Sequence, residues 1–446
     1  MSQFMQAVRV HFAAVSDHVL GQLSQDEAAT LNLCAEDTLY VRFNANRVRQ
    51  NTDVQQMSLS LQLQSQGRTV EQSCTLSGLL QADQSLLSDM LRTCRAEIRV
   101  LEVDPHQVPI VNHGSSDEEF PGALVAAQDL VPAILEIAQG CDLAGLYAGG
   151  VVIRANRNSA GQRHWFATES FFLDYSLYDG SKAAKGSYAG ARWDSADWAT
   201  NLARTRDLLE KLKRPTVNVK PGQYRTYLAP RAFADVLGMM GWNALSAAAW
   251  KQGRSPFKKL VEREARFSPL LSFGENFGLA LTPRFNSLGE VSQSHLPLMK
   301  SGELCTLLVN SRTAKEYGLA GNAAGDGEAP RSLDVACGTL AEPDILRAIG
   351  TGLYLSNVHY LNWSDPVSAR ITGMTRYACF WVENGEIVGP INDLRWDESL
   401  YDALGTKLMA LTNWADIDPA CETYYMRSLG GSRVPGALIQ DWTFTL

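Results

Sequence analysis

The seven histidines are the residues of this chain whose chemistry is best suited to a metal ion. A hydrolytic zinc site needs two or three His, Cys or carboxylate ligands and a further carboxylate that activates the bound water. No histidine is followed by Glu, so the sequence contains neither HExxH nor HExxxH. The histidines are spread along the chain: His11, His18, His106, His113, His164, His295 and His359. A metal site assembled from residues far apart in the sequence would have no such motif and remains possible.

Four of the histidine positions still require an interpretation. His106 and His113 lie in a Pro-rich stretch beside acidic residues, but no ligand spacing supports a metal there, and a solvated linker is the better interpretation. His359 comes shortly before Asp365 and could contact a ligand, although a structural histidine is favoured. His164 precedes two aromatic residues and is expected to pack in a sheet.

Motifs for nucleotides and for nucleophilic catalysis are also missing. The chain has no Walker-type loop, no GxGxxG that opens a helix after a strand, and no GxSxG elbow. Ser/His or Cys/His pairs brought together by the fold remain open. The cysteines include no CxxC pair and are expected to be reduced, mostly buried thiols: Cys34, Cys74, Cys94, Cys141, Cys305, Cys337, Cys379 and Cys421.

Composition indicates a soluble globular protein of two or three structural units. The chain has 446 residues, of which 45% are hydrophobic and 20% are charged. Its net charge of −8 and its scattered Lys and Arg residues argue against a nucleic-acid partner. We find no signal peptide and no apolar run of about 18 residues, so we expect a cytoplasmic protein with no membrane partner.

Hydrophobic spacing predicts an α+β fold in three parts. Residues 1–104 form an N-terminal α+β domain with a first helix, a strand meander and a second helix. Its expected elements are helix 1–34, strands Leu39–Phe43, Met57–Leu63 and Thr69–Leu76, and helix 84–95. Residues 105–215 form a central segment that opens with a Pro-rich connection over 106–122. Its expected elements are helix 123–138, strands 145–155 and 164–172, and helix Ser195–Lys213, capped by Asp194 or Ser195.

Residues 216–446 are predicted to form a large, strand-rich C-terminal domain. We expect a strand at Gly222–Leu228, a helix at Pro230–Lys251, and then short strands separated by turns. The clearest of these strands are Glu303–Asn310, Gly352–Val358 and Tyr377–Val382. Asn384-Gly385 flanked by apolar residues is a strong hairpin signal, because both residues tolerate positive φ. The Gly/Ala-rich segment 320–330 is expected to be a mobile loop.

Several segments together resemble the TldD/PmbA (TldE) family, described as modulators of DNA gyrase and related to metallopeptidases. The strongest is YACFWVENGEIVGP at Tyr377–Pro390, which resembles the strand, ENG turn and strand near the family's C-terminus. Ile345–Val358 resembles the helix and strand that precede this hairpin. Looser matches lie at Glu36–Ser77, Phe267–Gly274 and Leu281–Glu290.

In the catalytic members of that family, HExxxH lies on a helix that resembles Ala229–Ser246 here. The resemblance places Gly238, Met239 and Asn243 at the positions of His, Glu and His. The family's third zinc ligand is a C-terminal Cys, but the matching region Leu429–Gly436 has none, and Cys421 lies too far upstream. The resemblance therefore implies the PmbA/TldE branch without its own zinc or catalytic residues.

The implied function is that of a non-catalytic TldE/PmbA-like subunit of a cytoplasmic TldD/TldE-type metallopeptidase. A TldD-like catalytic partner would hold the zinc, and this chain would hold an extended peptide by strand addition. Unfolded or ribosomally made peptides are the expected substrates, and Asp365 is a candidate peptide contact. One alternative is a free-standing homodimeric peptide-binding or scaffold protein. Another is an independent hydrolase with an unrecognised site.

Overall fold

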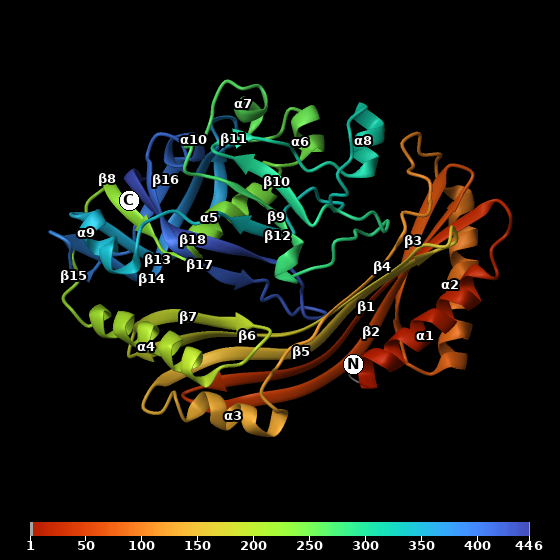
Figure 1. Cartoon of the computed structure of the whole chain (residues 1–446), viewed down its shortest axis with the longest axis horizontal. Helices are drawn as coiled ribbons and strands as arrows, with labels where there is room; N and C mark the ends of the chain where they lie inside the picture. The colour runs from red at the N-terminus through yellow and green to blue at the C-terminus, as the bar shows by residue number, and fades with distance from the viewer. Residues whose placement is uncertain (1–2, 446) are drawn as a thin grey trace.

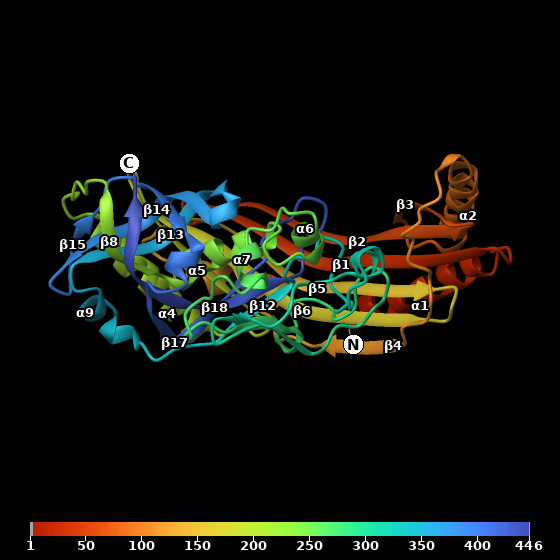
Figure 2. The ribbon, with the colours of Figure 1, turned by 90° about the horizontal axis from the view of Figure 1, so that it is seen from above.

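The protein is an elongated molecule built around two large β-sheets (Figure 1). The computed structural model describes residues 3–445. A long, curved sheet formed by the N-terminal half runs along the molecule, and the C-terminal half lies over one end of it (Figures 1 and 2). Two N-terminal helices, α1 (Gln3–Leu20) and α2 (Leu80–Glu97), pack at the opposite end. The expected α+β fold is confirmed.

The first sheet has the strand order β3-β2-β1-β5-β6-β4, with β7 pairing only with β6. The bounds of its strands are β1 Glu27–Asn44, β2 Arg47–Ser65, β3 Arg68–Leu76, β4 Ser115–Phe120, β5 Asp142–Asn158, β6 Arg163–Asp179 and β7 Lys182–Gly190. Strands from residues 1–104 and from residues 105–215 thus share one sheet, and β1 pairs with β5 over 14 residues, from Thr30 to Phe43. The expected boundary at residue 105 lies between strands of this sheet.

The helices are α1 Gln3–Leu20, α2 Leu80–Glu97, α3 Ala127–Leu135, α4 Ser195–Leu212, α5 Pro230–Gly238, α6 Ala247–Lys251, α7 Lys258–Val261, α8 Ser311–Tyr317, α9 Ile345–Ile349 and α10 Leu400–Ala403. The N-cap of α4 is Asp194, whose Oδ1 accepts hydrogen bonds from the backbone N–H groups of Ala196 at 2.8 Å and Asp197 at 3.2 Å. These bonds satisfy donors that the first turn of a helix leaves free. No helix in residues 3–445 is long and apolar enough to cross a membrane.

The prediction of a helix over residues 1–34 is wrong in its second half. Helix α1 ends at Leu20, and β1 begins at Glu27, well before the expected Leu39. Alternate side chains of this early part, from Ala29 to Ala35, are buried against α1 and α2. Residues at alternate positions are buried there, as in a strand. Small or apolar residues also occur between these positions, so the sequence can be taken for a helical pattern. The Pro-rich connection also contains a strand, β4, which pairs in parallel with β6.

The second sheet has the order β11-β10-β9-β12-β18-β16-β14-β13-β8, and a further pairing of β18 with β8 closes part of it into a ring. The bounds of its strands are β8 Gly222–Leu228, β9 Phe273–Asn276, β10 His295–Lys300, β11 Glu303–Leu304, β12 Ser332–Val335, β13 Gly352–Asp365, β14 Arg370–Glu383, β15 Glu386–Pro390, β16 Arg395–Ser399, β17 Leu408–Pro419 and β18 Gly431–Phe444. Helix α5 packs against β13 and β18, and its apolar side chains enter the largest core.

The predicted hairpin of β14 and β15 is confirmed. Asn384 and Gly385 form its turn with φ of 53° and 80°, as the Asn-Gly signal requires. Cys379 belongs to the core around α5, whereas Phe380 and Val382 point into a second core, which also contains residues of α3, α4 and β6. Strand β14 therefore separates two cores and joins the C-terminal half to the first sheet.

Two other predictions for the C-terminal half need correction. The helix expected over Pro230–Lys251 stops at Gly238, continues as a short 3-10 turn over Met239–Gly241, and resumes as α6. Asn243 has φ of 71°, which no helix residue adopts. The strand expected at Glu303–Asn310 is limited to Glu303–Leu304, because the chain leaves the edge of the sheet there and enters α8.

Candidate functional site

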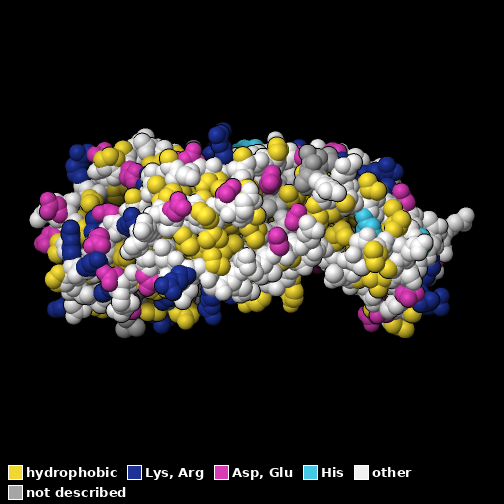
Figure 3. Space-filling view, turned by 90° about the horizontal axis from the view of Figure 1, so that it is seen from below, with side chains coloured by type: hydrophobic (Ala, Val, Ile, Leu, Met, Phe, Trp, Pro, Cys, Tyr) yellow, Lys and Arg dark blue, Asp and Glu magenta, His cyan; other side chains and the backbone are white. Residues whose placement is uncertain are grey.

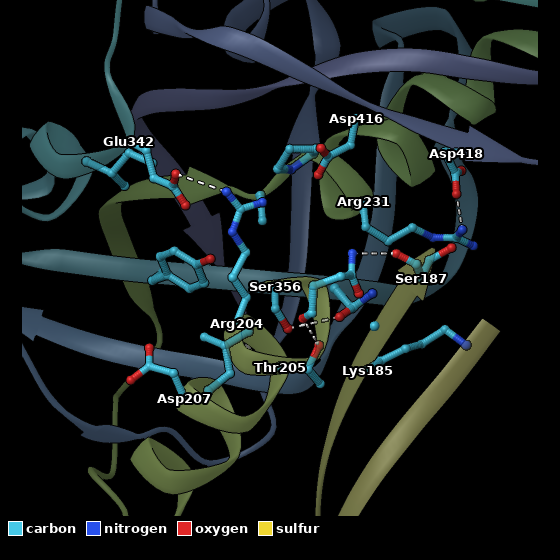
Figure 4. A pocket seen from close by; sticks show the side chains of 18 of the residues that line it. Lys185, Ser187, Arg204, Thr205, Asp207, Arg231, Glu342, Ser356, Asp416 and Asp418 are labelled. Atoms are coloured by element: carbon cyan, nitrogen blue, oxygen red, sulfur yellow. Dashed lines mark hydrogen bonds and ion pairs between the residues drawn. The ribbon is translucent and has the colours of Figure 1, made fainter. Parts of the chain in front are cut away.

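A cavity of about 490 Å³ lies where the first sheet meets the C-terminal half (Figure 4). We call it the cleft. Strand β7 and helix α4 line one side, and β8, α5, β13, β17 and the segment around α9 line the other. The long sheet and the ring of strands thus contribute opposite walls, so the cleft exists only because the two halves pack together.

Two strands with an unpaired edge border the cleft. Within the described chain, β7 forms a ladder only with β6. Strand β17 forms a ladder only with β18, and its other edge is hydrogen-bonded to the segment 338–340 at Leu411–Asn413 but is open along Trp414–Asp418. Lys185–Ala189 of β7 and Trp414–Asp418 of β17 line the cavity. A side-chain amide occupies one backbone acceptor at the β7 edge, where Asn201 Nδ2 donates to the carbonyl oxygen of Ser187 at 2.9 Å. Unpaired strand edges are templates for an additional extended segment.

A charged cluster lies on the C-terminal wall of the cleft. Arg231, at the start of α5, forms an ion pair with Asp418 of β17, and its Nε lies 3.6 Å from Oδ1 of Asp235 one turn later. Burial raises the pKa of Asp235 to about 6; Asp418 adds to this effect, and Arg231 opposes it. Burial also raises the pKa of Asp418. One guanidinium therefore stabilises two half-buried carboxylates, of which Asp235 gains a proton in mildly acidic solution.

The opposite rim of the cleft carries a second ion pair. Arg204 Nη2 of α4 lies 3.4 Å from Oε2 of Glu342, which precedes α9, and both side chains are about half exposed. Figure 4 shows Arg204 reaching toward Glu342, while Arg231 points to Asp418 at the other end of the cavity. Tyr227 and Tyr354 also line the cleft, and burial raises the pKa of both phenols, so both stay neutral. The cleft thus offers paired charges at its ends and also aromatic surface.

Gly238, Met239 and Asn243, which stand at the positions of the family's HExxxH motif, do not form a metal site. Gly238 has no side chain, and a Cβ placed there would meet no atom within 4 Å. Met239 is 3% exposed and packs in the core around α5, and Asn243 is exposed in the turn after the helix. Across residues 3–445, no group of three or more His, Cys, Asp or Glu side chains is placed to hold a metal ion. The residues present at this helix do not fit zinc.

Cys421 lies beside the charged cluster of the cleft. Burial raises the pKa of its thiol to about 12, and the nearby charges of Asp174 and Arg231 act on it in opposite directions. The thiol is therefore protonated at neutral pH, which is the unreactive form. In the sequence, Cys421 lies upstream of the segment Leu429–Gly436, and this separation gave no indication that the fold brings Cys421 close to Arg231 of α5.

Asp365 lies at the end of β13, outside the cleft. Its Oδ1 accepts a hydrogen bond from the backbone N–H of Val367 at 3.0 Å, and its Oδ2 accepts one from the hydroxyl of Ser368. Hydrogen bonding to Ser368 lowers the pKa of the Asp365 carboxyl. The carboxylate thus stabilises the turn between β13 and β14, and its role as a peptide contact stays a prediction.

The histidines singled out from the sequence lie in separate surroundings. His164 is buried in β6, stacks on Phe285 with ring centroids 5.0 Å apart, and accepts or donates a hydrogen bond to Ser116 Oγ at 2.8 Å. Burial lowers its pKa, so it is neutral. His113 lies 3.9 Å from Glu290, and His359 packs against Tyr360. None of these histidines lines the cleft.

The charged residues of the cleft were not predicted. Arg231 and Asp235 could have been noticed as an i, i+4 pair in an otherwise apolar helix. Asp418 has no such signal, because 187 residues separate it from Arg231. Arg204 looks like any other basic residue of a solvated helix until Glu342 is placed opposite to it.

Comparison with known proteins adds family and fold. The PmbA/TldA metallopeptidase C-terminal domain family matches residues 221–446, half of the chain. A search of the curated proteins finds no match.

Three solved structures share the fold over nearly the whole chain. A proposed modulator of a DNA gyrase from Thermotoga maritima is 15% identical, with a TM-score of 0.77 and coverage of 97% of this chain and 100% of that one. TldE from Thermococcus kodakarensis is 14% identical, with a TM-score of 0.75 and coverage of 99% and 100%. A proposed modulator of DNA gyrase from Bacteroides thetaiotaomicron is 16% identical, with a TM-score of 0.75 and coverage of 98% of each chain. The family match and the shared fold together show that this chain belongs to the TldD/PmbA (TldE) family.

Proposed function

We propose that this chain is the non-catalytic, TldE-like subunit of a cytoplasmic TldD/TldE-type metallopeptidase. The observation that carries the proposal is the helix α5, which ends at Gly238 and is followed by Met239 in a 3-10 turn, at the positions to which the family resemblance assigns the His and Glu of catalytic members. Met239 is part of the core, and Asn243 lies in a turn with positive φ. Peptide hydrolysis needs an electrophile for the carbonyl and a base for water, and none of these three side chains supplies either.

The cleft supports a role in holding the substrate. An extended peptide placed along the free edge of β7, or along the free part of the β17 edge, would find backbone donors and acceptors there. The half-buried, neutral phenol of Tyr354, backed by the buried Tyr227, offers aromatic surface for its side chains. Unfolded or ribosomally made peptides suit such a site, because a folded protein does not present a single free strand. Asp365 is retained as a second, separate candidate contact.

The catalytic zinc would belong to a TldD-like partner, and this chain would complete the peptide-accepting chamber. The face seen from below mixes acidic and basic side chains and has hydrophobic side chains near its middle (Figure 3). That face shows no continuous basic stripe of the kind that nucleic acid requires. A peptide is therefore a better-matched ligand than DNA, despite the gyrase-related names of two similar structures.

The test is to measure cleavage of an unstructured peptide by this chain alone, by a TldD-like partner from the same source alone, and by the two together. We expect cleavage only when the partner is present, and faster cleavage by the pair. Chelator-sensitive cleavage by this chain alone would contradict the proposal. Equal rates for the partner and the pair would remove the supporting role, and a stable homodimer that does not associate with the partner would favour a free-standing binding protein.

A matched pair of variants locates the effect. Arg204→Gln removes a guanidinium from the cleft rim, where it pairs with Glu342. Arg92→Gln removes an exposed guanidinium from α2, where it pairs with Asp89 far from the cleft. Both changes remove one exposed ion pair on a helix, so both should have similar, small effects on stability. Only Arg204→Gln should slow cleavage by the pair, without changing the zinc content of the partner.

A further inference from the structure

A second cavity of about 270 Å³ continues the cleft. Ala189 of β7 and Ile417 of β17 line both cavities. Along β7, the residues before Ala189 line the cleft and those after it, Gly190 and Ala191, line the second cavity. Along β17, the order is the same, and Pro419 and Ala420 reach the second cavity. Both free strand edges therefore lead from the cleft into this smaller space.

Arg427 is the one charged residue among those that line the second cavity. It is 4% exposed. Its Nη1 donates to the carbonyl oxygen of Gly150 at 3.3 Å, and its Nη2 donates to the hydroxyl of Ser170. Its backbone N–H, not its guanidinium, donates to Oε2 of Glu36 at 3.2 Å. No carboxylate in residues 3–445 forms an ion pair with the Arg427 guanidinium.

A buried guanidinium without a direct ion pair is unusual, because buried charges in proteins are normally paired, and the buried Glu36 carboxylate acts on Arg427 only as a nearby charge. Burial lowers the pKa of Arg427 to about 10, so the side chain remains a cation at neutral pH. Its two neutral acceptors leave donors of the guanidinium without a protein partner. The guanidinium group fits a carboxylate, which can accept two parallel hydrogen bonds from it.

The other walls of the cavity are apolar or carry hydroxyl groups. Phe172, Leu281 and Leu429 supply apolar surface, Thr168 adds a hydroxyl-bearing side chain, and the Ser170 hydroxyl lies against the cation. The volume of about 270 Å³ accommodates one or two amino-acid residues rather than a longer segment. The chemistry thus suits a ligand with one carboxylate and one apolar group, and a peptide that ends in an apolar residue is such a ligand.

We propose that Arg427 binds the C-terminal carboxylate of the peptide that lies in the cleft, and that the cavity around it accepts the last, apolar side chain. This inference rests on the proposed peptide-holding function and specifies its substrate class as peptides with a free C-terminus. A peptide that ends at Arg427 runs parallel to both β7 and β17, because both strands run from the cleft toward this cavity. The cavity thereby fixes the direction and the register of the bound peptide.

The test compares two peptides on the unmodified chain. Both carry the same N-terminal fluorophore and the same unstructured sequence ending in Leu, but one has a free C-terminal carboxylate and the other a C-terminal amide. We expect fluorescence anisotropy to show about 10- to 100-fold weaker binding of the amide, since a charge-assisted pair is lost. Equal binding of the two peptides would overturn the inference while leaving the proposed function intact. Binding of neither peptide would overturn both.

Two variants and one competitor assign the effect to Arg427. Arg427→Gln should bind the two peptides equally. Arg154→Gln removes a neighbouring guanidinium that contacts the same loop, with Nη2 3.5 Å from the carbonyl oxygen of Arg427, but does not line the cavity, so it should keep the preference. A preference that persists in a folded Arg427→Gln chain would contradict the assignment. Displacement of the peptide by an equal concentration of acetate would identify a site for small anions and would also contradict it.

Discussion

The substitution Phe380→Ala tests how the two halves of the chain are joined. Phe380 is fully buried in β14, and its ring centroid lies 6.2 Å from that of Tyr354. It belongs to the core that also holds Leu173 of β6 and Trp198 of α4. Removal of a fully buried Phe ring loses its burial free energy and leaves a cavity, which together destabilise a protein by about 3–5 kcal/mol. Because this core includes both sheets, we expect both halves to unfold more easily.

The assay is urea unfolding followed by tryptophan fluorescence and by far-UV circular dichroism. The matched control is Val388→Ala in the neighbouring strand β15, where the side chain is 43% exposed and the expected change is within about 0.5 kcal/mol. Phe380→Ala should lower the urea midpoint clearly, and Val388→Ala should not. A Phe380→Ala midpoint equal to that of the control would refute the burial argument. A loss confined to the C-terminal half would refute the shared core.

Three further outcomes are expected. Burial raises the pKa of Asp235 from 3.8 to about 6, so the folded chain binds this proton more tightly than the unfolded chain, and the associated stability is lost as pH rises through that window. In Asp235→Asn, the free energy of unfolding should lose up to about 3 kcal/mol of its change with pH, as measured from urea midpoints across this pH range. An unchanged dependence of the midpoint on pH would contradict the assignment. Arg231→Met should destabilise the chain by about 1–3 kcal/mol, since Asp418 loses its partner while solvent still screens this partly exposed pair; a midpoint like that of the unmodified chain would argue against the ion pair. The purified chain should hold no stoichiometric zinc, and elemental analysis that finds about one tightly bound metal ion per chain would require ligands other than Gly238, Met239 and Asn243.

The elements that the sequence predicted well are those with a strong local signal. Strand Gly222–Leu228 has the expected bounds, α4 begins after its Asp194 cap, and the Asn384-Gly385 turn forms the expected hairpin. In each case the determining residues are neighbours in the chain. The break of the helix after Gly238 lacked such a signal, because Met-Met-Gly-Trp-Asn keeps enough apolar residues to continue a helical pattern.

Long-range contacts explain what the sequence could not predict. The segment 320–330 looks like a flexible, Gly-rich loop, yet its Glu328 is 2% exposed. The Glu328 carboxylate accepts hydrogen bonds from Ser246 Oγ at 2.6 Å and from the backbone N–H groups of Ala248 and Asn310, both at 2.9 Å. The cleft and the Arg427 cavity are likewise assembled from residues far apart in the chain. Hydrophobic periodicity reports which face of an element is buried but not which element covers it.

The ring that closes the second sheet has a consequence for biosynthesis. Strand β18 pairs with β8, β12, β16 and β17, all of which precede it in the chain. Phe444 pairs with Gly222, so nearly the whole C-terminal half, residues 223–443, is translated between these two partners. Until Gly431–Phe444 has left the ribosome, β8 has no antiparallel neighbour and its edge remains open to solvent. We therefore expect the nascent C-terminal half to depend on chaperones until synthesis passes β18, whereas the first sheet, complete by Gly190, can fold while translation continues.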